Sequence, residues 1–147
     1  MWLSYIPRPI KLFDSILKPL SKTLKALELC FGTYGGAEQP LEGIAVELEK
    51  LQGDNAIETI ILVYDSLESM FSTTAGNWSR LDQVLTDPGW PSLVEVTLSI
   101  DIRVVRHYCK KGGFEENVRK MVAVEFSRLR MSKAIRFDFV YIDESNA

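Results

Sequence analysis

The sequence has little of the chemistry on which reactive or disulfide-stapled proteins depend. Its 147 residues include two cysteines, Cys30 and Cys109, and a single histidine, His107. Two distant cysteines without a C-x-x-C pair provide neither a disulfide framework nor the ligands of a zinc site. A reducing compartment is the default for such a chain, so we expect it in the cytoplasm or the nucleus.

Long apolar runs are also missing. No stretch approaches the roughly 18 apolar residues of a membrane helix. The apolar start, Met1–Ile6, lacks a preceding basic segment and is interrupted by Pro7, Arg8 and Pro9, which does not fit a secretory signal peptide. The sequence therefore predicts no membrane association, and we interpret Asn77 in the pattern Asn-Trp-Ser as a helix cap rather than as a glycosylation site.

An overall excess of positive charge is missing as well. The formal net charge is −3, which gives no general nucleic-acid footprint. Basic residues do gather between Arg103 and Arg136, where they outnumber acidic ones. This segment could meet an acidic partner or nucleic acid, but a solvated helix face is the simpler interpretation, and we predict no nucleic-acid binding.

The chain does have the composition of an ordinary globular domain. Hydrophobic residues make up 46% of it and charged residues 25%. A chain of this length buries about two thirds of its unfolded surface, so a sizeable core is possible. We expect a single domain over residues 1–147.

One stretch, residues 78–102, contains a helix, a breaker and a strand. Trp78, Leu81, Val84 and Leu85 have the spacing of one helix face, and Asp87-Pro88-Gly89 ends that helix. The segment Leu93–Leu98 then alternates as a half-buried strand. The stretch therefore predicts one αβ unit.

The strand of this unit recurs along the chain. Leu93-x-x-Val96-x-Leu98 fits the leucine-rich-repeat strand template, and the same template begins at Leu24 and at Ile57. A fourth alternating segment, Ile135–Ile142, closes the series, giving offsets of 33, 36 and 42 residues between units. These units are longer than the usual leucine-rich repeat of about 20 to 29 residues, so we expect enlarged loops.

Helical patterns separate the strands. They cover 10–20, 40–51, 78–85 and 114–129, and Val124 is among the residues expected on the buried side of the last helix. The sequence therefore predicts an α/β fold of four roughly parallel strands alternating with helices, arranged as a leucine-rich-repeat-like arc. A small doubly wound sheet with helices on both faces is the alternative.

A word order in the third unit suggests a family. The series Trp78, Leu81-Asp82, Leu85, Pro88 and Pro91-Ser92-Leu93 resembles the C-terminal repeats of divergent fungal F-box proteins with degenerate leucine-rich repeats. The resemblance covers about residues 24–142 and implies a substrate-recognition role. No segment here matches the F-box itself, so docking on a Skp1-type adaptor is not expected, and the chain is interpreted as a fragment or truncated relative.

Candidate chemistry is sparse. The loops at 32–36 and 72–77 could hold a nucleotide or flavin phosphate in a flavodoxin-like protein, but neither has a complete phosphate-binding motif. His107 beside Cys109 lacks a third catalytic group, and Asp65, Asp101 and Asp143, which could converge as metal ligands, are more often turn formers. We therefore predict no enzyme activity and no catalytic, cofactor or metal site.

The remaining function class is a protein-interaction module. Outward strand positions would bind an unidentified protein partner on the concave face, and the predicted set is Lys25, Glu28, Glu58, Thr59, Glu95, Thr97 and Arg136. The last strand, Ile135–Ile142, is strongly apolar and close to the end of the sequence. We expect it to drive self-association or to need a partner.

Overall fold

A parallel β-sheet organises the molecule. The computed structural model describes residues 2–5, 18–32, 41–67, 78–103 and 113–143. The elements in chain order are β1 (Trp2–Tyr5), α1 (Lys18–Leu20), β2 (Ala26–Gly32), α2 (Leu41–Leu51), β3 (Thr59–Leu67), α3 (Trp78–Thr86), β4 (Glu95–Arg103), α4 (Phe114–Glu125), α5 (Ser127–Met131) and β5 (Arg136–Asp143).

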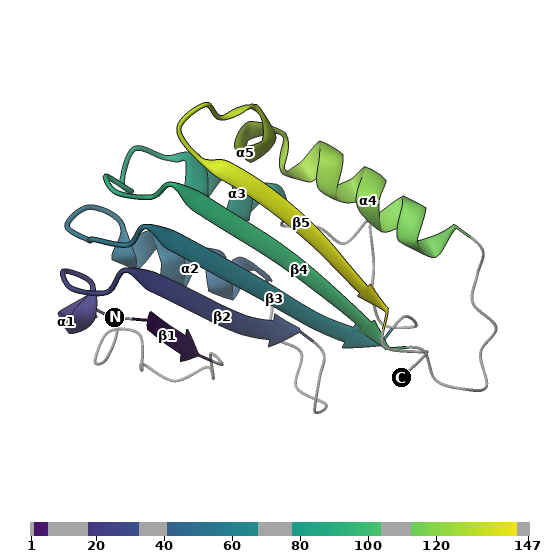
Figure 1. Cartoon of the computed structure of the whole chain (residues 1–147), viewed down its shortest axis with the longest axis horizontal. Helices are drawn as coiled ribbons and strands as arrows, with labels where there is room; N and C mark the ends of the chain where they lie inside the picture. Colours follow the sequence, from purple (N-terminus) through teal and green to yellow (C-terminus); the bar gives the residue numbers. More distant parts are fainter. Residues whose placement is uncertain (1, 6–17, 33–40, 68–77, 104–112, 144–147) are drawn as a thin grey trace.

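The five strands lie in chain order, β1-β2-β3-β4-β5, and every neighbouring pair is parallel. Helices α2 to α5 lie on one side of this sheet (Figure 1). The prediction of an α/β fold with four neighbouring parallel strands that alternate with helices is confirmed for β2 to β5, and β1, which was not predicted, pairs with β2 as a fifth strand. A doubly wound sheet would have helices on both faces and a reversal of strand order, and the described elements have neither.

The register aligns the units with one another. Ala26, Thr59, Glu95 and Arg136 are successive partners across four strands, so the units are offset by 33, 36 and 41 residues. The predicted last offset of 42 residues is therefore wrong by one residue. Phe137 and Phe139 are the register partners of Val96 and Leu98, so Ala134 rather than Ile135 occupies the first template position of the last unit.

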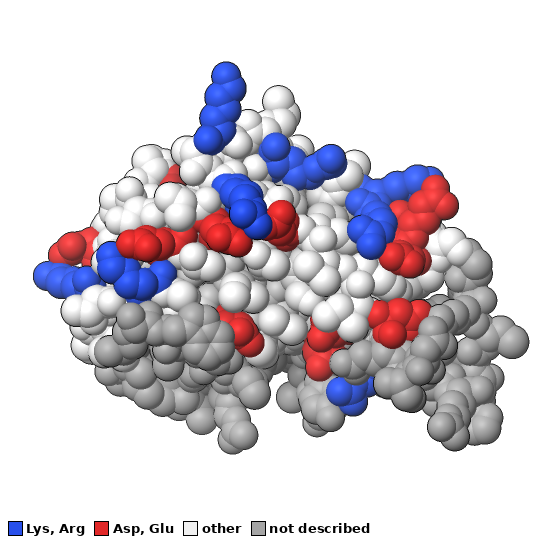
Figure 2. Space-filling view, in the orientation of Figure 1, with Lys and Arg blue, Asp and Glu red and all other residues white. Residues whose placement is uncertain are grey.

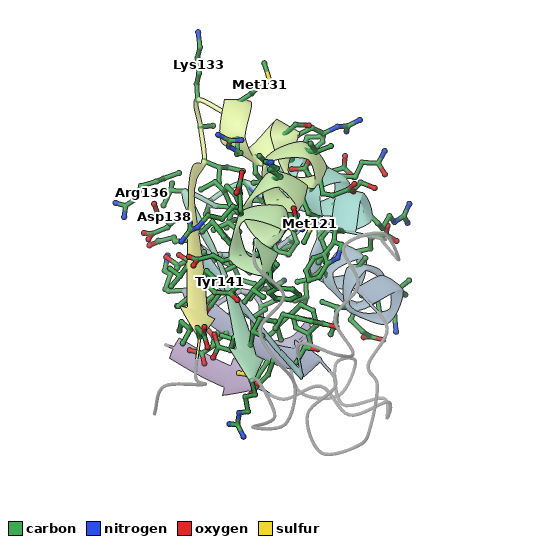
Figure 3. The ribbon with its side chains drawn as sticks, turned by 90° about the vertical axis from the view of Figure 1, so that its right-hand side faces the viewer. Met121, Met131, Lys133, Arg136, Asp138 and Tyr141 are labelled. Atoms are coloured by element: carbon green, nitrogen blue, oxygen red, sulfur yellow. The ribbon has the colours of Figure 1, made fainter. Side chains whose placement is uncertain are left out.

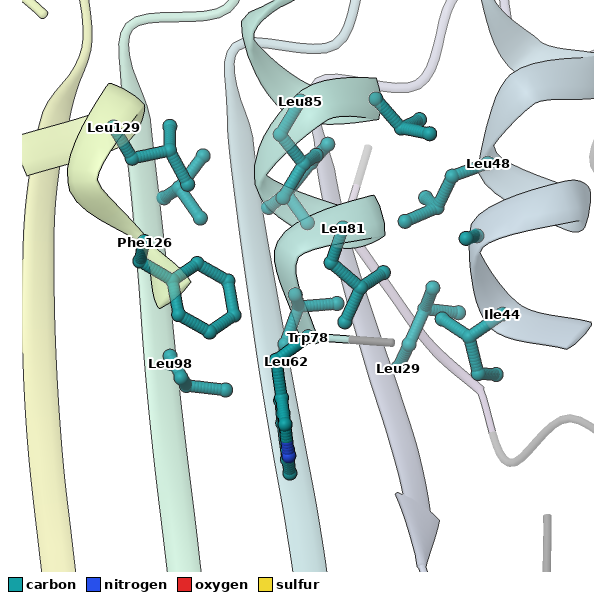
Figure 4. Packing of buried hydrophobic residues seen from close by; sticks show 14 of the residues in the cluster. Leu29, Ile44, Leu48, Leu62, Trp78, Leu81, Leu85, Leu98, Phe126 and Leu129 are labelled. Carbon is teal, nitrogen blue, oxygen red and sulfur yellow. The ribbon is translucent and has the colours of Figure 1, made fainter. Parts of the chain in front are cut away.

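The face of the sheet toward the helices forms the core (Figure 4). Leu29, Leu62 and Leu98 are register partners in adjacent strands, and each is fully buried. Leu48 and Leu81 cover them from α2 and α3 and are equally buried. Because burying one such side chain contributes about 1.5–3 kcal/mol, this layer is the main source of stability.

Aromatic rings connect the units through the core. Ring centroids are 5.3 Å apart for Phe31 and Tyr64, 5.1 Å for Tyr64 and Trp78, and 6.2 Å for Trp78 and Phe126. Phe126 then stacks on Phe137 at 5.5 Å. Trp78, the first residue of the predicted αβ unit, is therefore a central member of a ring series that runs from β2 to β5.

Polar contacts hold the turns that precede the strands. The buried Asn55 side chain donates to the carbonyl oxygens of Leu51 and Gly89, at 2.8 and 3.2 Å, and accepts from the N–H of Ile57 at 3.2 Å. One amide thus joins the end of α2, the start of β3 and the turn of the next unit. Such a satisfied buried amide fixes the spacing of adjacent units.

The segment predicted as the last helix, residues 114–129, forms two helices, α4 and α5. The chain leaves helical geometry at Phe126, with φ −106° and ψ 34°, between α4 and α5. Val124 was expected to be buried and is 70% exposed, because two residues after the buried Val122 the helical repeat of 3.6 residues per turn places it on the opposite side of α4. Of the predicted first helix, only Lys18–Leu20 is helical within the described residues, and residues 10–17 lie outside them.

Candidate functional site

The second face of the sheet carries no described helix. Its side chains are the alternate strand residues that face away from the core, and on β4 these are Glu95, Thr97, Ser99, Asp101 and Arg103, all partly exposed. We call this surface the open face. Its other described side chains are Ala26, Glu28 and Cys30 from β2, Thr59, Ile61, Val63 and Asp65 from β3, and Arg136, Asp138, Val140 and Ile142 from β5.

The predicted binding residues gather at one end of the open face. Thr59, Glu95 and Arg136 are successive register partners in the first row of the strands. Glu28 and Thr97 lie in the next row, with Ile61 between them.

The two remaining predicted residues lie at the rim. Lys25 and Glu58 precede β2 and β3, and both are exposed. They form an ion pair in which Lys25 Nζ lies 2.8 Å from Glu58 Oε1. The structure thus places all seven predicted residues on or beside one surface.

Negative charge predominates on the open face. Its carboxylates are Glu28, Asp65, Glu95, Asp101 and Asp138, against the guanidiniums of Arg103 and Arg136. Figure 2 shows carboxylates in a line that crosses the sheet, with further ones below it. A partner that complements this surface would carry positive charge.

Arg136 is engaged within the molecule. Its guanidinium donates to Asp138 Oδ2, with Nε at 2.9 Å and Nη2 at 2.8 Å, and Nη2 lies 3.8 Å from Glu95 Oε1. The hydrogen bond to Asp138, and then the two negative charges, raise the pKa of Arg136. Figure 3 shows Arg136 and Asp138 together on the side of β5 away from the helices. Arg136 therefore neutralises part of the acidic surface.

Cys30 lies among carboxylates on the open face. Its Sγ is 3.5 Å from Glu28 Oε1, to which the thiol donates. Burial, followed by the charge and hydrogen bond of Glu28, raises the pKa of the Cys30 thiol from 9.0 to about 11. The thiolate is the nucleophilic form of cysteine, so a catalytic thiol requires a lowered pKa. The raised pKa of Cys30 is the opposite of this requirement.

Sequence reasoning missed the aliphatic part of the open face. Ile61 and Val63 are partly exposed between the acidic rows, and Val140 and Ile142 on β5 are 42% and 39% exposed. The segment Ile60–Val63 is continuously apolar, which is typical of a parallel strand covered at least in part on both faces. Successive side chains of a strand point to opposite faces of the sheet. Because Ile60 and Leu62 face the core, Ile61 and Val63 must face the other way, and this alternation is the signal that identifies them as surface residues.

The three aspartates considered as metal ligands do not come together. Asp65 and Asp101 are register partners on the open face, but Asp143 pairs with the buried Ile102 and falls on the opposite side of the sheet. Across the described ranges, no three His, Cys, Asp or Glu side chains could hold a metal ion. His107, Cys109 and the loops at 33–36 and 72–77 lie outside those ranges, and no helix within them is long and apolar enough to span a membrane.

Gly32, the first residue of the loop considered for phosphate binding, has a structural reason for its identity. Its φ is +135°, and a Cβ there would lie 2.0 Å from the carbonyl oxygen of Asp65. Glycine is needed because β2 ends against the backbone of β3.

Comparison with protein-family models, with curated protein sequences and with solved structures found no match to this chain. The resemblance to F-box repeat proteins therefore rests on the sequence pattern alone.

Proposed function

We propose that this chain is a non-enzymatic protein-interaction module whose open face binds a partner protein. The observation that carries the proposal is the open face itself, where acidic and aliphatic side chains of four parallel strands form one surface without a described covering helix. Sheets with helices on one side present such a face to partners in repeat proteins.

The composition of the open face defines the partner. Ile61 and Val63 lie in the middle of the sheet, with Glu28 and Cys30 on one side and Thr97 and Ser99 on the other. An aliphatic centre with a charged surround is the usual anatomy of a protein interface. The complementary surface would present aliphatic side chains between lysines or arginines.

The architecture that we propose is a leucine-rich-repeat-like arc, with β2, β3, β4 and β5 as equivalent strands. The buried partners Leu29, Leu62 and Leu98 occupy equivalent template positions and support this proposal. The role that follows resembles substrate recognition by the repeats of F-box proteins, in the cytoplasm or the nucleus. A Skp1-type adaptor is not among the proposed partners.

The proposal is tested by placing a large charged side chain at Thr97, the register partner of Ile61. Thr97→Arg adds bulk and positive charge without breaking a described ion pair, whereas Ser79→Arg adds the same side chain on the exposed surface of α3, behind the sheet. Tagged wild type and both variants would be used for affinity capture with quantitative mass spectrometry. Partners retained by Ser79→Arg and reduced about tenfold by Thr97→Arg are expected for a central interface position. Equal recovery by all three proteins would contradict the proposal.

Nucleotide binding offers an independent check. FMN, ATP and NAD should leave the melting temperature unchanged. A ligand that binds the folded state at about 100 times its dissociation constant adds about 2.7 kcal/mol, which shifts the melting temperature by several degrees. A shift of that size would replace the interaction-module proposal with the flavodoxin-like or nucleotide-binding alternative.

A further inference from the structure

An open hollow of about 530 Å³ lies where α4 and α5 meet the edge strand β5. This volume falls within the range of about 300–1,000 Å³ that is usual for ligand pockets. The residues that matter for its chemistry are Arg119, Ala123, Arg130, Arg136, Phe137 and Phe139.

The charged lining of the hollow is entirely positive. Three arginines and no acidic residue contribute to its described lining, and the guanidiniums of Arg119 and Arg130 supply the charge, because that of Arg136 lies on the other side of β5 with Asp138. Arg119 donates from Nε and Nη2 to Glu115 Oε1, at 3.2 and 3.0 Å, and Arg136 is held by Asp138. Arg130 forms no ion pair with any residue that the structure describes, which leaves its charge available to a ligand.

The aromatic side chains that line the hollow are only partly covered. Phe137 and Phe139 are partly exposed, whereas their register partners Val96 and Leu98 on β4 are fully buried. The guanidinium carbon of Arg119 lies 5.5 Å from the centroid of the Phe139 ring. Aromatic surface and positive charge therefore meet in the same hollow.

We propose that this hollow binds an acidic peptide segment of a partner protein. A large apolar side chain of the peptide would pack on Phe137 and Phe139, and flanking carboxylates would pair with Arg130 and Arg119. Charge complementarity selects this ligand, because guanidiniums recognise carboxylates with two parallel hydrogen bonds. A nucleic-acid strand is the other polyanion that guanidiniums bind, and competition with a single-stranded oligonucleotide distinguishes the two ligands. The inference uses a different surface from the open face and does not depend on its function.

The probe is a fluorescein-labelled peptide, Asp-Glu-Phe-Asp-Glu, titrated with the full chain and followed by anisotropy. Binding should weaken at high salt, and the matched peptides Asn-Gln-Phe-Asn-Gln and Asp-Glu-Ala-Asp-Glu should each bind about tenfold more weakly or worse, because one lacks the charges and the other the anchor.

Two variants test the location. Arg130→Glu should lower affinity for the probe about tenfold, whereas Arg128→Glu, on the same helix but lining a different hollow, should lower it less than about threefold. Ala123→Trp fills the hollow from α4 without deleting a core side chain and should abolish binding while the chain stays folded by circular dichroism. The proposal would be overturned if the probe did not bind, or if Arg130→Glu and Ala123→Trp left its binding unchanged. It would also be overturned if a single-stranded oligonucleotide competed for the hollow and bound more tightly than the probe.

Discussion

The carboxylate of Asp82 caps a helix that begins 45 residues later in the chain: Oδ1 accepts the backbone N–H of Leu129 at 2.8 Å. Oδ2 accepts the N–H of Arg128 at 3.0 Å. Asp82 is 3% exposed, so these bonds form out of contact with bulk water. They join α3 of one unit to α5 of the next and satisfy N–H groups that the start of α5 would otherwise leave unpaired.

Replacing this cap should destabilise the whole domain. Asp82→Ala leaves two buried or partly buried N–H groups without acceptors, and we expect it to lower the free energy of unfolding by about 1–3 kcal/mol. The measurement is urea denaturation followed by circular dichroism. Asp87→Ala, at an exposed position just after α3, is the control and should change stability by less than about 0.5 kcal/mol. Equal effects of the two variants would show that the cap contributes nothing.

The same contact explains a limit of sequence reasoning. The period of apolar residues continues from Val118 through Leu129 with no glycine or proline, so the sequence predicts one helix. The break at Phe126 arises from tertiary structure, because Asp82 holds the N–H groups of the next turn and Phe126 packs on Trp78 and Phe137. Local pattern contains no information on a partner so distant in sequence.

The other elements also divide into those with a local apolar pattern and those that depend on tertiary contacts. The strands β2 to β5 and the helices α2 and α3 were predictable because their apolar residues alternate, or recur with helical spacing, over several positions. β1 was missed because four residues before two prolines show no clear period, and they form a strand through pairing with β2. On the open face, alternation located Glu95 and Thr97, while Ile61 and Val63 were missed because their strand is apolar on both sides.

Gly32 and Gly113 provide a test of the close approach between β2 and β3. Both have positive φ, but a Cβ at Gly113 meets nothing within 4 Å, whereas one at Gly32 collides with Asp65. Gly113→Ala should cost about 1 kcal/mol from backbone strain alone. Gly32→Ala should cost at least about 2 kcal/mol more, since the two strands must separate. Equal costs in chemical denaturation would contradict this explanation of Gly32.

The Cys30 thiol should react slowly at neutral pH. Because its pKa is raised to about 11, alkylation by iodoacetamide, followed at Cys30 by peptide mass spectrometry, should accelerate up to about pH 11 rather than level off near pH 9. Glu28→Gln removes the nearest negative charge and should speed alkylation at any fixed pH below 9. Since the folded-state pKa is raised, the protonated thiol stabilises the fold below about pH 9, and this contribution is lost as pH rises toward 11. A rate that levels off near pH 9 in the folded protein would refute the shift.

The last strand should govern self-association. β5 is at the edge of the described sheet and bears the exposed side chains of Val140 and Ile142. Multi-angle light scattering over a concentration series should show association of the wild type, and Val140→Lys should reduce it with little loss of stability, because charge on an edge strand opposes pairing. Phe139→Asp should instead lower the free energy of unfolding, since Phe139 packs against the core. A wild type that stays monomeric at high concentration would show that this edge does not pair.

Protein binding by the open face is measured directly as the dissociation constant of a purified partner from the wild type, Thr97→Arg and Ser79→Arg, by isothermal titration calorimetry. Thr97→Arg should raise this constant by about tenfold or more, whereas Ser79→Arg should leave it within about twofold, both variants having the wild-type melting temperature. Equal dissociation constants for all three proteins would contradict binding at the open face.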